Sequence, residues 1–249
     1  MNNTLNNKRI LLGVTGSIAA YKSPLLLREL IKLGANVQVI MTPASSNFVS
    51  PTVMSNLSHN NVIIDMFDSN NQNDGAWHIK LAHQSDLMII APCSLSTLSK
   101  IAYGMCDNAL TTLTIALENS VPLLISPAMD STMWTHPATQ RAVKQVVDDG
   151  AILIPPIDGE LSSGLIGPGR LPDIPDLVRQ VEVTLNKATS TNRYNYTNYK
   201  AGEAIEKEPK KIEHIPNLID TPIYPISNDI DKDKFNSELE FHKLKNKLV

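Results

Sequence analysis

Residues 9–41 read RILLGVTGSIAAYKSPLLLRELIKLGANVQVIM, with one apolar run at each end and helical periodicity between them. The runs 9–14 and 36–41 predict two buried strands. Ser23-Pro24 is typical of a helix start and Gly34 of a helix end. Two strands joined by one helix run parallel, because a parallel pair needs a crossover connection. The stretch therefore predicts the strand–helix–strand unit of an α/β fold.

The same alternation continues to about Leu185. Strands are expected over 62–66, 86–91, 121–126 and 151–154, and helices over 77–84, from 92–97 onward, over 107–117 and over 137–148. Apolar strands that alternate with helices predict a parallel sheet covered on both faces. The expected fold is α/β: a doubly wound, three-layer domain of the flavodoxin-like or Rossmann-like kind.

The composition changes at about residue 186, where polar, charged and Pro-punctuated stretches replace the apolar pattern. Such a segment lacks the apolar periodicity that would offset its ordering entropy. We therefore expect a domain of residues 1–186 and a polar, flexible C-terminal tail of residues 187–249.

Charge and cysteine content narrow the function classes. A formal net charge of -3 gives no electrostatic case for nucleic acid or an anionic membrane. The apolar runs are strand-length, and residues 1–8 are polar with no apolar segment typical of a signal peptide behind them. The two cysteines, Cys93 and Cys106, have neither metal-type nor redox-type spacing. The sequence thus predicts a cytoplasmic protein without a metal site.

The turn after the first strand, Gly16–Ala19, consists of small residues in front of a helix, where backbone N–H groups can approach a phosphate. It is not a GxGxxG motif, and the second strand ends in the hydroxyl-bearing stretch 42–46 instead of a ribose-binding carboxylate. A monophosphate such as that of FMN therefore suits this edge better than a dinucleotide. The alternative is a tight turn selected for packing, although Ser94, Ser96 and Thr97 at the same sheet edge favour a ligand.

Three further features stand out. The stretch Pro127–Trp134 (PAMDSTMW) follows a strand and so reaches the carboxyl edge of the sheet, although Met129 and Met133 in isolation would be core residues. His78 begins a helix and could exchange protons near neutral pH; the alternative is a surface or packed histidine. The glycine-rich stretch 159–170 predicts a long ordered loop or flap ending in Arg170, which could meet a phosphate or a carboxylate.

Together these motifs resemble the phosphopantothenoylcysteine decarboxylases, which belong to the flavin-dependent cysteine decarboxylases. The resemblance covers about residues 8–181, and no stretch resembles the synthetase half of two-domain bacterial forms. It is carried by Gly13–Lys22, His78, Ala91-Pro92 with Ser96–Leu98, Gly104 with Asp107-Asn108, Pro127–Trp134, and Gly164 with Gly167–Arg170.

The resemblance implies bound FMN and a homotrimer or dodecamer whose sites lie between subunits, with the histidine facing a neighbour's flavin. It implies that the catalytic residues are His78, Asp130 and Ser163. It implies that the substrate is bound by Asp130, Met133, Ser163 and Arg170. It implies that FMN is held by Gly16, Ser17, Ile18, Ala19, Thr42, Ala44, Phe48, Pro92, Ser94, Ser96, Thr97 and Met129.

The implied reaction is the decarboxylation of 4′-phosphopantothenoylcysteine to 4′-phosphopantetheine in coenzyme A biosynthesis. An acylated cysteine has no electron sink beside its carboxylate. Oxidation of the thiol to a thioaldehyde creates one, so that CO2 can leave and the resulting enethiol can be reduced again.

Two departures from the family pattern matter. Asp130 stands where the family usually has an Asn that contacts the substrate carboxylate; an ionised Asp would repel that group, whereas a protonated one could donate to it. Ser163 stands where many members carry a proton-donating Cys. Two alternatives therefore stay open: an oxidative decarboxylase of a C-terminal peptidyl cysteine that stops at the enethiol, and a non-catalytic regulatory relative that binds phosphatases.

Overall fold

The computed structural model describes residues 4–67 and 76–187. A five-stranded parallel sheet forms its centre, in the order β2-β1-β3-β4-β5. This is the flavodoxin-like strand order, so the predicted fold class is confirmed. The strands are β1 (Arg9–Val14), β2 (Asn36–Met41), β3 (Leu87–Cys93), β4 (Leu123–Pro127) and β5 (Ile152–Leu153).

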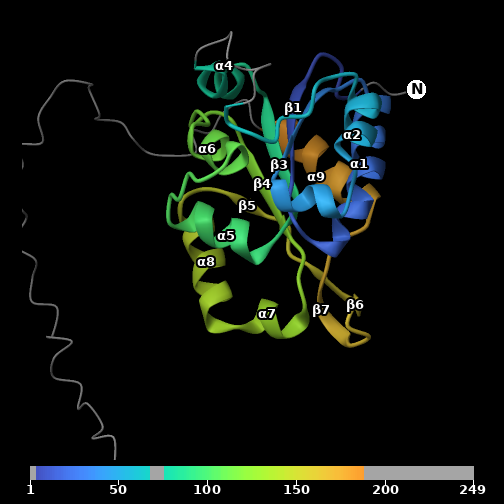
Figure 1. Ribbon diagram of the computed structural model, residues 1–249, viewed down its shortest axis with the longest axis vertical. Coiled ribbons are helices and arrows are strands. Elements are labelled where there is room, and N and C mark those ends of the chain that lie inside the picture. The colour runs from blue at the N-terminus through green and yellow to red at the C-terminus, as the bar shows by residue number, and fades with distance from the viewer. Residues whose placement is uncertain (1–3, 68–75, 188–249) are drawn as a thin grey trace, which may run out of the picture. The chain divides into compact units, whose positions relative to one another are not determined.

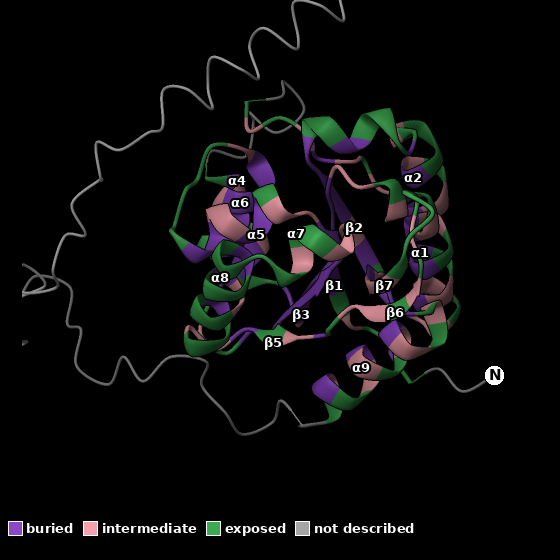
Figure 2. Cartoon of the chain, turned by 90° about the horizontal axis from the view of Figure 1, so that it is seen from below, coloured by how far each residue is buried: buried purple, intermediate pink, exposed green. Residues whose placement is uncertain are grey.

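Helices cover both faces of the sheet (Figures 1 and 2). One core cluster joins Leu12 of β1 to Leu27 and Val181 on one face, and a second joins Leu11 to Leu98 on the other. The first face carries α1 (Ser23–Lys32), α2 (Pro51–Ser58) and α9 (Ile174–Lys187); the second carries α4 (Trp77–His83), α5 (Leu95–Ala102), α6 (Ala109–Ile115) and α8 (Pro137–Asp148). Every residue of the central strand β3 is buried, as expected for a strand covered on both sides.

Local sequence explains how the first helix begins and ends. Pro24 stands in the first turn of α1, where its missing N–H costs no hydrogen bond. Leu26, Leu27 and Leu30 are buried against the sheet. Gly34 follows the helix at φ 95°, a left-handed conformation that glycine adopts without a Cβ penalty. The crossover thus returns the chain to the start of β2.

Two expectations about secondary structure need correction. The strand predicted over 62–66 is wrong, because only Ile63 forms a bridge, with Ile40. The Asp65 side chain accepts from the Phe67 N–H at 3.0 Å and turns the chain away from the sheet. The loop predicted over 159–170 is instead an antiparallel hairpin of β6 (Ile157–Glu160) and β7 (Ile166–Arg170). Its glycines and Pro168 hide the side-chain alternation by which strands are predicted, and its pairing is carried by the backbone.

Other expectations concern absences and the C-terminal segment. Within residues 4–67 and 76–187 no helix is long and apolar enough to cross a membrane. The same residues contain no cluster of three or more His, Cys, Asp or Glu side chains that could hold a metal ion. The tail predicted over 187–249 lies, apart from Lys187, outside the described residues.

Candidate functional site

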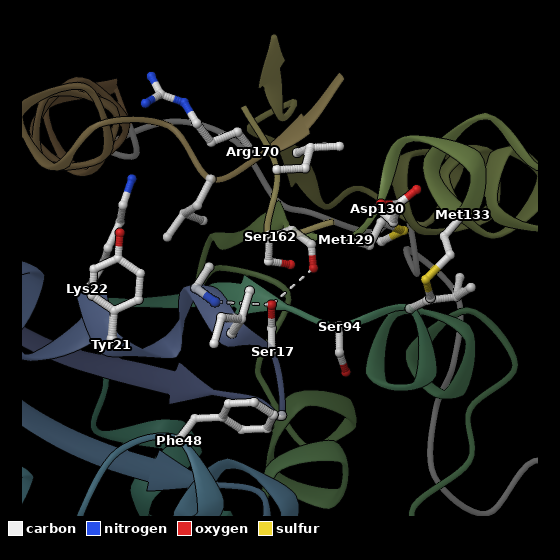
Figure 3. Close-up of a pocket in the computed structure, with 18 of the residues that line it drawn as sticks. Ser17, Tyr21, Lys22, Phe48, Ser94, Met129, Asp130, Met133, Ser162 and Arg170 are labelled. Atoms are coloured by element: carbon white, nitrogen blue, oxygen red, sulfur yellow. Dashed lines mark hydrogen bonds between the residues drawn. The ribbon is translucent and has the colours of Figure 1, made fainter. Parts of the chain in front are cut away.

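A cavity of about 740 Å³ opens at the carboxyl ends of β1, β3 and β4 (Figure 3). Ligands bind at this edge in open α/β sheets, and the volume falls within the range of small-molecule sites. The residues that line it come from the loops after β1, β2, β3 and β4 and from the hairpin: Gly16, Ser17, Ile18, Ala19, Tyr21, Lys22, Phe48, Ser94, Leu95, Ala128, Met129, Asp130, Met133, Glu160, Leu161, Ser162, Gly169, Arg170 and Leu171.

The loop after β1 is fixed from two sides. The Ser17 hydroxyl donates to the carbonyl of Ala128 at 3.2 Å and accepts from the Ala19 N–H at 3.4 Å. A Cβ on Gly16 would lie only 2.8 Å from the Cβ of Ala44. A glycine is therefore required for the loop to lie this close to the segment that follows β2.

A buried threonine holds the turn between β3 and α5. The Thr15 hydroxyl donates to the carbonyl of Pro92 at 2.8 Å and accepts from the Ser94 N–H at 2.7 Å. The Ala91–Pro92 peptide bond in this turn is cis. Ser94 then caps α5 by accepting from the Thr97 N–H at 3.4 Å. The backbone of Ser94 is thus held at the cavity by a residue that does not line it.

Asp130 caps the short helix α7 (Ser131–Thr135) and accepts three hydrogen bonds. Its Oδ1 accepts from the backbone N–H and the hydroxyl of Thr132 at 3.1 and 3.0 Å. Its Oδ2 accepts from the Ser163 hydroxyl at 2.6 Å. The hydrogen bond from Ser163, followed by those from Thr132, lowers the pKa of Asp130 below its ordinary value. The carboxylate is therefore ionised at neutral pH.

Glycines allow the hairpin to lie against the β4–α7 segment. Gly169 has φ 143°, and a Cβ there would lie 2.2 Å from the carbonyl oxygen of Met129. The Met129 N–H donates to the Gly169 carbonyl at 3.1 Å. At Gly167 a Cβ would lie 2.8 Å from the Ser131 hydroxyl. The hairpin thereby forms one wall of the cavity.

The two cations that line the cavity, Lys22 and Arg170, lie on a different side of it from the Asp130 carboxylate (Figure 3). Asp173 lies near both cations, 3.9 Å from Lys22 Nζ and 3.5 Å from Arg170 Nη2. The Nε atom of Arg170 is buried and has no hydrogen-bond partner. The cations, which Asp173 already approaches, therefore lie on one side of the cavity and the Asp130 carboxylate lies on the other (Figure 3).

His78 lies apart from these residues. It belongs to α4 and is absent from the cavity lining. Its ring meets Trp77 edge-on, with centroids 5.6 Å apart, and its buried Nδ1 has no hydrogen-bond partner. One copy of the chain thus does not bring His78 and Asp130 into one cavity.

The other expected site residues fall into two groups. Gly16–Ala19, Phe48, Ser94, Met129, Met133 and Arg170 line the cavity with Asp130, whereas Thr42, Ala44, Pro92, Ser96, Thr97 and Ser163 are not among its lining residues. Thr15 and Lys22 lie in the Gly13–Lys22 motif and Ser162 in the stretch 159–170, but the sequence analysis named none of them as a site residue. A hydroxyl at the end of a buried strand, and a cation one turn after a phosphate-type loop, were the available signals for the first two.

The residues present fit a flavin mononucleotide. Small residues and the Ser17 hydroxyl offer polar contacts at the loop after β1, and Phe48, Leu95 and Met129 offer apolar surface for a ring system. The buried Thr42 hydroxyl at the end of β2 has no partner, and no carboxylate stands there to bind a ribose. A sheet of this order with such a cavity defines the flavodoxin-like class of cofactor-binding proteins.

Comparison with known proteins gives the family. The Flavoprotein family matches residues 1–186, so the chain belongs to the Flavoprotein family. The coenzyme A biosynthesis bifunctional protein CoaBC of Bacillus subtilis (strain 168) is 39% identical over 186 residues, which are 75% of this chain and 45% of that protein. The chain thus spans about half the length of that relative.

Solved structures agree with this assignment. A cysteine-to-serine mutant of PPC decarboxylase complexed with pantothenoylaminoethenethiol matches with a TM-score of 0.65 and 32% identity, covering 73% of this chain and 100% of that one. The FMN-dependent cysteine decarboxylase SpaF matches with a TM-score of 0.65 and 29% identity, covering 75% of this chain and 99% of that one.

Proposed function

We propose that the chain catalyses the FMN-dependent decarboxylation of 4′-phosphopantothenoylcysteine to 4′-phosphopantetheine in coenzyme A biosynthesis. The observation that carries the proposal is the cavity itself, in which the Gly16–Ala19 loop and the Pro127–Trp134 stretch meet at the carboxyl edge of a flavodoxin-order sheet. The family, the relative active in coenzyme A biosynthesis and the PPC decarboxylase structure support this choice. The two free thiols, Cys93 and Cys106, agree with a cytoplasmic location.

The chain's own residues would bind and orient the cofactor and the substrate. Gly16–Ala19 and Ser94 would hold the phosphate and polar edges of FMN, and Phe48 and Met129 would pack on its ring. Bound FMN would supply the two-electron oxidation and reduction. Met133, Asp130 and Ser163 would surround the cysteine end of the substrate, while Arg170 would attract an anionic group.

We propose further that the working unit is a homotrimer, alone or within a dodecamer, with each site shared between subunits. The position of His78 outside its own cavity, with a buried and unpartnered Nδ1, supports this proposal. A neighbouring subunit would present His78 to the substrate. Light scattering of the purified protein tests the assembly, and a monomeric, fully active protein would overturn it.

The function is tested by anaerobic incubation of the purified protein with 4′-phosphopantothenoylcysteine, followed by mass spectrometry and a flavin spectrum. A yellow protein that yields 4′-phosphopantetheine is the expected result. The His78→Asn variant should stay yellow and lose turnover, since it keeps the helix and removes the proton-exchanging ring. Colourless protein, or yellow protein that leaves the substrate untouched, would overturn the proposal.

A second candidate function is oxidative decarboxylation of a C-terminal peptidyl cysteine, ending at the enethiol. The observation that favours it is the Ser163 hydroxyl, which donates a hydrogen bond to Asp130 and stands where a more acidic thiol would otherwise serve as proton donor. Loss of CO2 together with two hydrogens from a peptide substrate would support this candidate. Loss of CO2 alone supports the coenzyme A reaction.

A further inference from the structure

Decarboxylation without net oxidation consumes a proton. The balance is R–COO⁻ + H⁺ → R–H + CO2, so the carbon that loses CO2 must receive one proton from a group in the site. A serine hydroxyl is a weak acid and, without help, is a poor source of that proton. Which group of this chain supplies the proton depends on the proposed function, on which the assignment below rests.

The contact between Asp130 and Ser163 offers an answer. Their oxygens are 2.6 Å apart, a length typical of a hydroxyl that donates to a carboxylate. Oδ1 of Asp130 already accepts the two hydrogen bonds from Thr132. Oδ2 is therefore the oxygen across which Asp130 and Ser163 can share a proton. Asp130 lines the cavity, so the Ser163 hydroxyl, 2.6 Å from Oδ2 of Asp130, lies next to the cavity lining.

The surroundings leave Asp130 without a competing counter-ion. The other charged or titratable groups that line the cavity are Tyr21 and Lys22 from the loop after β1, and Glu160 and Arg170 from the hairpin. Helix α7, β4 and α5 contribute none to the lining. None of these groups forms an ion pair with Asp130 among the described residues, and the cations lie on the other side.

We propose that Asp130 and Ser163 form a two-residue proton relay, loaded when the substrate binds and discharged onto the carbon that loses CO2. A substrate carboxylate beside Asp130 places two like charges in one site, where one of the two carboxylates takes up a proton. CO2 then leaves from the ionised substrate carboxylate, its bonding electron pair enters the enethiolate, and the proton stays on Asp130.

Discharge completes the balance. The carbon–carbon double bond of the enethiolate takes the proton of the Ser163 hydroxyl, forming one C–H bond and a C=S group. Ser163 regains a proton from Asp130 across the 2.6 Å contact, which leaves Asp130 as a carboxylate and Ser163 neutral. The two-electron reduction of the C=S group belongs to the proposed function and involves neither side chain. Asp130 thus supplies the acidity, and Ser163 passes the proton on.

The loading step is tested by calorimetry with two thiol-free ligands on the FMN-loaded protein. N-(4′-phosphopantothenoyl)alanine keeps the carboxylate, and N-ethyl-4′-phosphopantothenamide lacks it. Titration at pH 7 in two buffers of different ionisation enthalpy gives the protons taken up per ligand. The alanine ligand should take up more, by up to about one proton. Because both ligands carry the same phosphate, its titration cancels, and Asp130→Asn should abolish the difference.

The discharge step is tested by product analysis of four proteins: wild type, Asp130→Asn, Ser163→Cys, and the double variant. Asp130→Asn should slow formation of saturated product by about 100-fold or more and accumulate enethiol, because the amide carries no transferable proton. In the Ser163→Cys background the same change should cost much less, because the thiol is itself an acid. A purely structural role of Asp130 predicts equal losses in both backgrounds. Thr135→Ala, on the same helix but outside the cavity lining, is the control for α7.

The two experiments distinguish a failure of the proton relay from a failure of the proposed function. If neither ligand binds to wild type or to the variants, the proposed function falls and the relay with it. If both ligands bind with equal proton uptake, or if Asp130→Asn forms saturated product at the wild-type rate, the relay is wrong while the proposed function stands. Melting temperature and flavin content of each variant identify losses that come from misfolding.

Discussion

Two parts of the cavity are built in opposite ways. The floor, residues 15–19 and 92–97, continues strands β1 and β3, and Thr15, Cys93 and Thr97 are buried. The wall, residues 157–170, is a hairpin whose tip is open to solvent, with Leu165 in the turn 53% exposed. Packing against the sheet and the two hydrogen bonds of Thr15 hold the floor. Close backbone approach at glycines, the hydrogen bond between Met129 and Gly169, and the hydrogen bond between Ser163 and Asp130 hold the wall. The comparison teaches that the floor fixes the shape of the cavity, and that the two departures from the family pattern, Asp130 and Ser163, meet where the wall contacts the segment after β4.

The largest effect is expected for Gly169→Ala in the wall. A Cβ at Gly169 would lie 2.2 Å from the Met129 carbonyl, in a backbone conformation of φ 143°. Strain and overlap together should lower the free energy of unfolding by roughly 3–5 kcal/mol and detach the hairpin. Chemical denaturation followed by circular dichroism measures the loss.

Gly164→Ala is the matched control in the same hairpin. Gly164 also has a positive φ, 80°, but a Cβ there meets nothing within 4 Å. Only the left-handed conformation is penalised, so the loss should be about 1 kcal/mol. Equal losses at the two positions would show that close approach to Met129 does not hold the wall.

A smaller effect is expected for Thr15→Val in the floor. Valine keeps the shape of the buried side chain but leaves the Pro92 carbonyl and the Ser94 N–H without their partner. The free energy of unfolding should fall by about 1–3 kcal/mol, and the flavin content should fall with it as Ser94 loses its position.

Thr114→Val is the control that separates the loss of the Thr15 hydrogen bonds from the general cost of removing a buried hydroxyl. Thr114 is also buried, and its hydroxyl donates to the Leu110 carbonyl within helix α6. That change should be nearly neutral and leave flavin content intact. A Thr114→Val loss as large as the Thr15→Val loss would assign the effect to burial instead of to the turn.

The same contrast explains what the sequence could predict. The floor was predictable because Arg9–Val14, Gly16 and the apolar run ending at Ala91 follow rules of periodicity and turn chemistry. The sheet, its two covered faces and the position of the loop after β1 all came from such local patterns. Thr15 escaped prediction because its two partners are 77 and 79 residues away in the chain.

The wall was predictable in composition but not in form. Four glycines and Pro168 indicated a special loop, yet the cross-strand pairing of Ile157 with Arg170 depends on backbone contacts that side-chain patterns do not report. Asp130 and Ser163 were singled out one at a time, as departures from a family pattern. Their hydrogen bond spans 33 residues of chain and became visible only in the folded protein.

A change of product, with little change of stability, is expected for Ser163→Cys. The side chain stays small and exposed at the hairpin tip, and a thiol is a stronger acid than a hydroxyl. We expect the ratio of saturated product to enethiol to rise, as measured by mass spectrometry after anaerobic turnover. An unchanged rate and ratio would remove position 163 from the proton transfer.

The smallest expected effect is the pH dependence of the stability that the hydrogen bond between Ser163 and Asp130 gives to the protein. Because hydrogen bonds from Ser163 and Thr132 lower the pKa of Asp130, the unfolded chain binds a proton there at a higher pH than the folded protein does. The stabilisation is therefore complete above the ordinary carboxyl pKa of about 4 and is lost as pH falls through the lower folded value.

We expect wild type to exceed Ser163→Ala in stability by a constant amount between pH 5 and pH 7, about one to three units above that ordinary value. The difference should shrink in more acidic buffer, as followed by denaturation at each pH. A difference that persists undiminished at pH values well below the ordinary carboxyl pKa would mean that Ser163 stabilises the hairpin without the Asp130 carboxylate. In that case the wall would be held by its backbone contacts with Met129 and not by the Asp130 carboxylate.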